Sequence, residues 1–169
     1  MSSGPRVADP SPDPNVSAPS PDPPAAAPLR WPPPVLLLRL TAVAVAAPAL
    51  VRAGLPRLQR WLEPSRPPPP IEAGRLGVLE DQMARWVDAV IRRGGPAVRP
   101  GCLTRGVTLY DALRRAGDDV ALCFGVGTAA GQTAGHCWLD RAGLPILERK
   151  DPRETFTEVV RVSRSGVTH

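Results

Sequence analysis

The sequence is poor in lysine, cysteine and histidine, and each shortage narrows what the chain can do. Lys150 is the only lysine although the net charge is +5, so arginine supplies the positive excess. No Lys/Arg run exceeds two residues and no aromatic-rich sheet motif accompanies the arginines, which argues against nucleic-acid binding. The three cysteines lack paired ligand spacing, and no secretory signal opens the chain. We therefore expect no metal, no cofactor, and a reducing, cytoplasmic setting.

Proline is scarce only in the second part of the chain. Of 23 prolines, 19 lie in residues 1–70 and four in the remaining 99. Proline lacks a backbone donor and resists helix and sheet interiors, so the compact part is expected late in the chain. Four segments follow from this: a disordered Pro-rich tail at 1–30, an apolar helical segment at 31–63, a stiff Pro-rich linker at 64–74 and a compact domain at 75–163.

The apolar segment contains a 17-residue run from Val35 to Val51 that includes Arg39 and Pro48. Its pattern predicts one helix and then a shorter helical piece that ends near Leu62. Three interpretations stay open. The helix packs on the compact domain or a partner protein, or it anchors the chain at a membrane surface, or it spans a bilayer, which is the least favoured because the run is short and interrupted.

The compact domain has the pattern of helices followed by strands. Apolar residues at three- and four-residue steps predict a helix over 76–93, and a second helix begins near Cys102 and ends at Gly117. We expect Arg105, Arg114 and Arg115 on its solvated face. Alternating segments predict strands at 119–127, 135–140, 144–148 and 155–162, with a polar turn at 128–133 and a frayed tail from 163. The predicted fold class is α+β, with helices followed by a small antiparallel sheet.

Cys102 stands where a nucleophile is expected. Free N–H groups and the positive end of the dipole at a helix start favour a thiolate over a thiol. His136 is its natural partner, since the other histidine, His169, is the C-terminal residue. Strand alternation places His136 and Trp138 on one face and Cys137 on the other, so we do not expect Cys137 to act as a second nucleophile.

A carboxylate on the next strand would complete a Cys-His-acid triad. Glu148 ends that strand, and Asp140 and Asp151 are the alternatives. An extended strand separates Asp140 from His136 by about 13 Å, which is too far for a side-chain hydrogen bond. Asp151 lies past the strand, next to a proline. Of the three members of the proposed triad, the carboxylate that orients the histidine is therefore the one that the sequence defines least.

Five short motifs give this region a family likeness: Cys-Leu-Thr-Arg-Gly at 102–106, Leu-Arg-Arg-Ala-Gly at 113–117, Phe-Gly-Val-Gly at 124–127, Gly-His-Cys-Trp-Leu at 135–139 and Pro-Ile-Leu-Glu at 145–148. In their order and spacing they resemble the transglutaminase-like cysteine peptidases of lasso-peptide biosynthesis, over residues 75–162. The resemblance implies a papain/transglutaminase-type core in which Cys102 attacks the scissile carbonyl, His136 is general base and acid, and an acidic residue twelve positions later, Glu148, orients the imidazole.

The resemblance also implies a function. Such an enzyme cuts the leader from a lasso precursor peptide and frees the core amine for a separate ATP-dependent macrolactam cyclase. Seventy Pro-rich residues do not form a winged-helix recognition domain, so we expect the stand-alone form, to which a separate recognition protein delivers the leader. Residues 31–62 are the expected docking surface for that protein or the cyclase. Two alternatives stay open: a non-catalytic transglutaminase-like scaffold, and an acyltransferase that joins glutamine to an amine.

Overall fold

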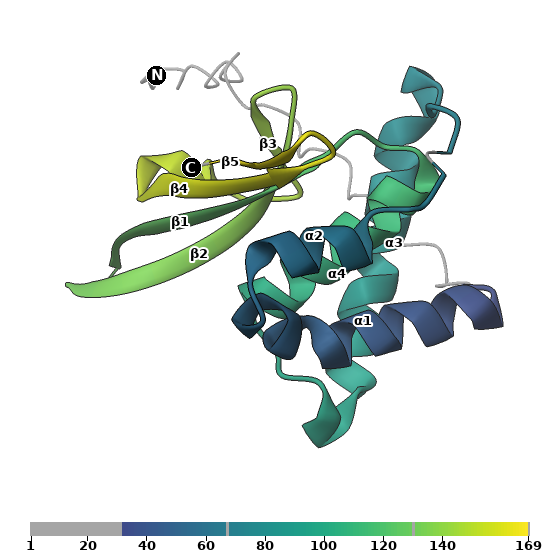
Figure 1. Ribbon diagram of the computed structural model, residues 1–169, viewed down its shortest axis with the longest axis horizontal. Coiled ribbons are helices and arrows are strands. Elements are labelled where there is room, and N and C mark those ends of the chain that lie inside the picture. The colour runs from purple at the N-terminus through teal and green to yellow at the C-terminus, as the bar shows by residue number, and fades with distance from the viewer. Residues whose placement is uncertain (1–31, 67, 130, 169) are drawn as a thin grey trace, which may run out of the picture.

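The computed structural model describes residues 32–66, 68–129 and 131–168. Over these residues four α-helices precede a five-stranded sheet, and Figure 1 shows the helices on one side of the molecule and the sheet on the other. The predicted α+β class is confirmed, while the tail predicted at 1–30 lies outside the described residues. The elements are α1 (Pro34–Arg52), α2 (Leu55–Leu62), α3 (Ala73–Arg93), the 3₁₀ turn η1 (Gly95–Ala97), α4 (Cys102–Ala116), β1 (Ala121–Ala129), β2 (Gln132–Arg141), β3 (Leu144–Ile146), the 3₁₀ turn η2 (Pro152–Glu154), β4 (Phe156–Ser163) and β5 (Gly166–Thr168).

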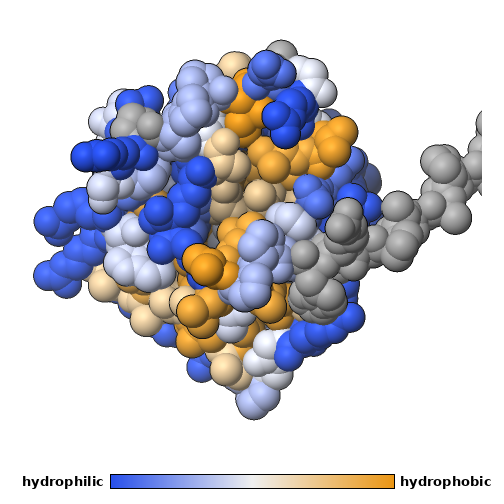
Figure 2. Space-filling model, turned by 90° about the vertical axis from the view of Figure 1, so that its right-hand side faces the viewer, coloured by the Kyte–Doolittle hydropathy of each residue, from blue (hydrophilic) through white to orange (hydrophobic). Residues whose placement is uncertain are grey.

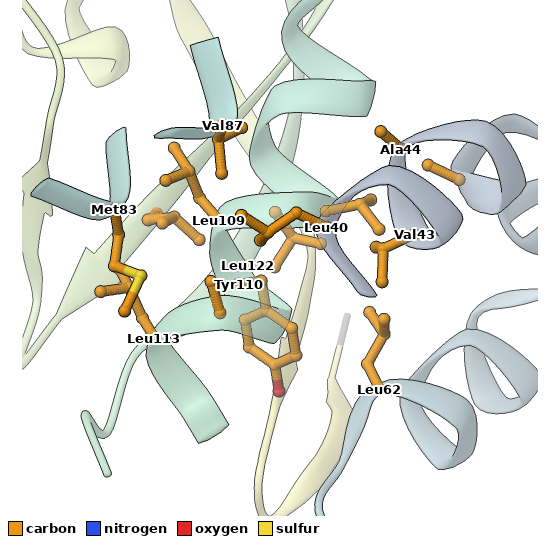
Figure 3. Close-up of a cluster of buried hydrophobic side chains, with 14 of the residues drawn as sticks. Leu40, Val43, Ala44, Leu62, Met83, Val87, Leu109, Tyr110, Leu113 and Leu122 are labelled. Atoms are coloured by element: carbon orange, nitrogen blue, oxygen red, sulfur yellow. The ribbon is translucent and has the colours of Figure 1, made fainter. Parts of the chain in front are cut away.

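Helix α4 is the centre of the packing. Most of its residues between Thr104 and Arg114 are buried, because α1 and α3 cover it and the sheet packs against it. Figure 3 shows α1, α2, α3, α4 and β1 all contributing apolar side chains to this core. The helix ends at Gly117, whose φ of 99° is the left-handed conformation that glycine adopts without strain. A Cβ at Gly117 would lie only 2.3 Å from the carbonyl oxygen of Pro69, so the Pro-rich linker passes directly over this helix end.

The apolar segment forms the two predicted helices, and α1 continues through Pro48. By length and composition α1 is apolar enough to cross a membrane. However, one of its faces is packed into the core of the domain, where Leu40, Val43, Ala44 and Ala47 are buried. Helices α1 and α2 and the domain 75–163, which the sequence separates, therefore share one core. If α1 spanned a bilayer, its four buried side chains would have to leave this core.

The expectation of a solvated arginine face on α4 is wrong for Arg114, while the side chains of Arg105 and Arg115 are about one third exposed. Arg114 is buried and donates to both carboxylate oxygens of Glu63 and to Asp119. Arg115 donates to Asp111, and Arg105 donates to Asp88 at 2.9 Å. The helical pattern alone does not predict these ion pairs. Each guanidinium pairs with a carboxylate, and the carboxylates of Glu63 and Asp88 lie outside α4.

The sheet is antiparallel throughout, in the order β3-β2-β1-β4-β5. Two predicted boundaries are wrong. Strands β1 and β2 extend into the stretch 128–133 expected as a turn and pair down to Ala129 and Gln132. The tail expected to fray beyond 163 forms β5 instead, since a turn closing at Gly166, with φ of 133°, brings it back against β4.

Strand β3 is shorter than predicted, and this matters for Glu148. It ends at Ile146, and Leu147 follows with a φ of 59°, which is uncommon for a residue with a side chain. The chain therefore leaves the sheet at Leu147. Glu148 lies just after this bend, where its carboxylate reaches the histidine on β2.

Candidate active site

Cys102 is the first residue of α4 and is exposed to solvent. Gly101 precedes it with a φ of 154°, and the loop before the helix is held by Thr104, whose hydroxyl donates to the carbonyl of Arg99 at 2.6 Å. Because the first helical N–H groups have no partner within the helix, the Cys102 backbone N–H is available to an oxyanion beside its own sulfur.

The Cys102 sulfur lies at the outer edge of β2. Among the residues that the structure describes, strand β3 pairs with β2 only from Leu139 to Arg141, so the part of β2 before Leu139 has no described strand on that side. There the Cys102 sulfur accepts hydrogen bonds from the side chain and the backbone N–H of Cys137, and it also interacts with His136. The start of α4 and the open edge of β2 thus bring Cys102 together with His136 and Cys137, which follow it by more than thirty positions in the chain.

This environment favours the thiolate. The hydrogen bond from the Cys137 side chain is the largest cause that lowers the pKa of Cys102, to about 5, and the Cys137 N–H and His136 lower it further against the opposing effect of burial. Cys137 behaves in the opposite way, since its bond to Cys102 and its burial raise its pKa well above the ordinary range. At neutral pH Cys102 is therefore the reactive thiolate and Cys137 the proton donor.

His136 lies between Cys102 and a carboxylate. Its Nε2 is 3.4 Å from Oε2 of Glu148, and both side chains are about a quarter exposed. This leaves Nδ1 as the ring nitrogen available to the Cys102 sulfur. The imidazole is held on its sides by Phe156 and Trp138, with ring centroids 5.2 and 6.2 Å away. Aromatic contacts and one carboxylate therefore fix the ring between its two partners.

The two competing carboxylates are engaged elsewhere. Asp140 is buried, accepts from Arg161 at 2.9 Å and also accepts from the backbone N–H of Gly143. Asp151 caps η2 and pairs with Arg153. Of the three carboxylates considered from the sequence, the structure brings Glu148 to His136.

Cys137 is the site residue that sequence reasoning missed. Alternation correctly separates it from the face that holds His136 and Trp138, but the face it occupies is the one that packs on α4. Its Sγ would lie 2.9 Å from a Cβ built on Gly106, one helical turn after Cys102. The missed signal is the spacing of Cys102 and Gly106: a residue without a side chain four positions later opens that helix face to the strand.

A cleft of about 600 Å³ opens beside His136. It combines aromatic and apolar walls with charges of both signs, which suits an extended peptide better than a uniformly charged ligand. Within the described ranges no cluster of three or more His, Cys, Asp or Glu side chains is placed to hold a metal ion. The cleft is lined by Asp88, Arg105, His136, Leu147, Glu148, Arg149, Lys150, Asp151, Pro152, Thr155 and Phe156.

A cysteine at the start of a helix that packs on an antiparallel sheet, beside a histidine from one strand, defines the thiol-bearing α+β class to which transglutaminases and papain-like enzymes belong. The sequence matches the family model described as "Transglutaminase-like superfamily" over residues 37–161, and the chain belongs to that superfamily, which includes cysteine peptidases. The match begins inside α1. Comparisons with curated proteins and with solved structures give no match.

Proposed function

We propose that this chain is a cysteine endopeptidase that removes the leader from a lasso precursor peptide. The observation that supports it best is the position of His136 between the Cys102 sulfur and the Glu148 carboxylate. The family match supports thiol chemistry, and the resemblance of the five motifs between Cys102 and Glu148 is the reason for proposing leader removal. Glu148 would hold the imidazole in one tautomer, and His136 would move the protons.

The proposed reaction has two halves. The Cys102 thiolate attacks the carbonyl carbon of the last leader residue, and the oxyanion is stabilised by the Cys102 backbone N–H. The peptide C–N bond breaks when His136 protonates the leaving nitrogen, which frees the core amine and leaves a thioester on Cys102. Water, deprotonated by His136, then hydrolyses the thioester and releases the leader. Because this needs a free thiolate, we place the reaction in the reducing cytoplasm.

The test is a mass measurement over time. The purified full chain is mixed with its proposed recognition protein and the candidate precursor, and intact masses are recorded. We expect the precursor to separate into leader and core, with one water added across the cut bond. A precursor that stays whole while bound would support the scaffold function instead. A product that has lost ammonia and joined an amine would support the acyltransferase.

We further propose that α1 and α2 present the docking surface for the recognition protein. Val35 and Leu38 are 81% and 72% exposed, and Val45 continues the same stripe along α1. Figure 2 looks onto the end of the molecule where α1 begins and shows apolar side chains at the surface there. No carboxylate occurs from residue 34 to 62, while Arg52 and Arg57 are exposed. The surface therefore fits a partner with an apolar patch and an acidic rim.

Replacing Leu38 with glutamate should weaken recognition-protein binding about tenfold or more, because the charge would be buried against an apolar partner surface. Val159→Glu, an exposed valine on β4, is the matched control and should bind normally. Binding is measured by titration with the purified recognition protein, alongside flotation with vesicles that contain phosphatidylglycerol. Equal protein binding by both variants, or loss of vesicle flotation alone in Leu38→Glu, would overturn the protein-docking proposal and favour a lipid surface.

A further inference from the structure

The reactive sulfur of the site has a second sulfur as its neighbour. The Cys137 sulfur packs on α4 at Gly106, one helical turn after Cys102, where a built Cβ would lie 2.9 Å from it, and a hydrogen bond from Cys137 is the largest cause that lowers the pKa of Cys102. In the mechanism above, Cys137 serves only as a hydrogen-bond donor that favours the Cys102 thiolate. A hydroxyl group would also donate, so the proposed reaction does not explain why this buried donor is a thiol.

The surrounding structure keeps the two sulfurs together. Gly106, four residues after Cys102, lets the Cys137 sulfur approach the helix. Cys137 is 4% exposed, and Leu122 packs beside it, so solvent oxidants reach Cys102 first. The third thiol, Cys123, is fully buried and pairs in register with Trp138, which puts it on the opposite face of the sheet from Cys137.

We propose that Cys102 and Cys137 form a peroxide-sensitive pair that closes reversibly to a disulfide. The Cys102 thiolate attacks one oxygen of a peroxide, the O–O bond breaks, and Cys102 becomes a sulfenic acid as the other oxygen leaves as water or alcohol. The Cys137 sulfur then attacks the Cys102 sulfur and displaces water, while the two cysteines together have lost two electrons to the peroxide. A cellular dithiol reductant restores both thiols by exchange.

The disulfide would switch the site off and protect it. With its sulfur bonded to Cys137, Cys102 cannot attack a carbonyl. Capture by Cys137 also competes with further oxidation to sulfinic acid, which reductants do not reverse. The bond itself depends only on the two thiols, so it is testable whether or not the chain cuts a lasso precursor.

The experiment treats the purified, reduced full chain with hydrogen peroxide in small stoichiometric steps. Intact mass, free-thiol count and peptide mapping are recorded before and after dithiothreitol. We expect the wild type to lose the mass of two hydrogens and to yield a linked peptide pair that contains Cys102 and Cys137. Dithiothreitol should return nearly all of the Cys102 thiol. Cys123→Ala is the matched control and should behave like the wild type.

Cys137→Ala separates capture from simple oxidation. In this variant we expect Cys102 to gain one oxygen, to react with a sulfenic-acid probe such as dimedone, and then to proceed to a sulfinic acid that dithiothreitol does not reverse. Because Cys137→Ala also removes the donor that favours the Cys102 thiolate, wild type and variant are compared at the same extent of Cys102 oxidation, where the fraction of Cys102 recovered should fall at least about tenfold. If Cys137→Ala folds poorly, peptide mapping of the oxidised wild type is sufficient by itself to test the proposal. A wild type that stays unlinked, links Cys123, or accumulates sulfinic acid at the variant's rate would overturn the proposal.

Discussion

Replacing Cys102 with alanine should lower kcat/KM for leader removal by about 10⁴-fold or more, because no other group in the site can form the acyl-enzyme. Cys137 is held as a thiol and is buried, so it should not substitute. The loss is measured from initial rates of leader release, with the recognition protein and precursor at fixed concentrations. Binding of the precursor should persist, since the substitution removes one exposed sulfur.

Matched variants separate chemistry from folding. Cys123→Ala removes a buried thiol away from the site and should retain full kcat. His136→Ala should cost about 10³-fold or more, and Glu148→Gln about 10- to 100-fold, since the first loses the proton carrier and the second only the group that orients it. Combining two of these changes should cost little more than the worse one alone, because they act as one unit. If Cys102→Ala keeps kcat/KM within about 100-fold of the wild type, the thiol mechanism is wrong.

The sequence predicts the helices, and the start of α4 near Cys102, well, for physical reasons. Apolar spacing at three and four residues defines α3, and the Pro-Gly step before Cys102 ends the preceding structure and opens α4. The stop at Gly117 is likewise predictable, because a left-handed residue ends the helix. These features depend on local backbone preferences, which the sequence states directly.

Features that depend on packing between distant segments were harder to predict. The left-handed bend at Leu147 brings Glu148 to His136, but the sequence does not predict it, because neither glycine nor asparagine occupies this position. The position of Cys137 beside Cys102 depends on how β2 lies across α4, and alternation gives only the face of the strand. Arg114 is buried for the same reason, since its partner Glu63 lies 51 residues earlier. The residue pattern along one helix or strand does not specify which side chains the neighbouring element places against it.

Asp111 tests whether α1 belongs to the folded domain. This carboxylate on α4 is 1% exposed and accepts two hydrogen bonds from Arg39 of α1, at 2.8 and 2.5 Å, and a third from Arg115. Arg39 also stacks over Trp61 of α2, 5.4 Å from the ring centroid. One buried charge therefore joins the apolar segment to the helix that begins with Cys102.

We expect Asp111→Ala to lower the free energy of unfolding by about 3 kcal/mol, because it leaves two guanidinium groups facing a buried position without their anion. For a domain of this size that is about 10 °C in Tm, measured by thermal or urea unfolding. Asp88→Ala is the control. Its pair with Arg105 has both side chains about one third exposed, so the loss should stay below about 1 kcal/mol.

Comparing the unfolding of Asp111→Ala with that of Asp88→Ala tests whether α1 folds together with the rest of the domain. If α1 were an anchor that merely rests on the domain, breaking its link to Asp111 would free the helix and leave the unfolding of α3, α4 and the sheet almost unchanged. Because Leu40, Val43 and Ala44 pack directly into the shared core, we expect instead a single transition shifted as a whole. Two transitions in Asp111→Ala, the first confined to α1, would show that residues 34–52 fold separately from the helix that holds Cys102.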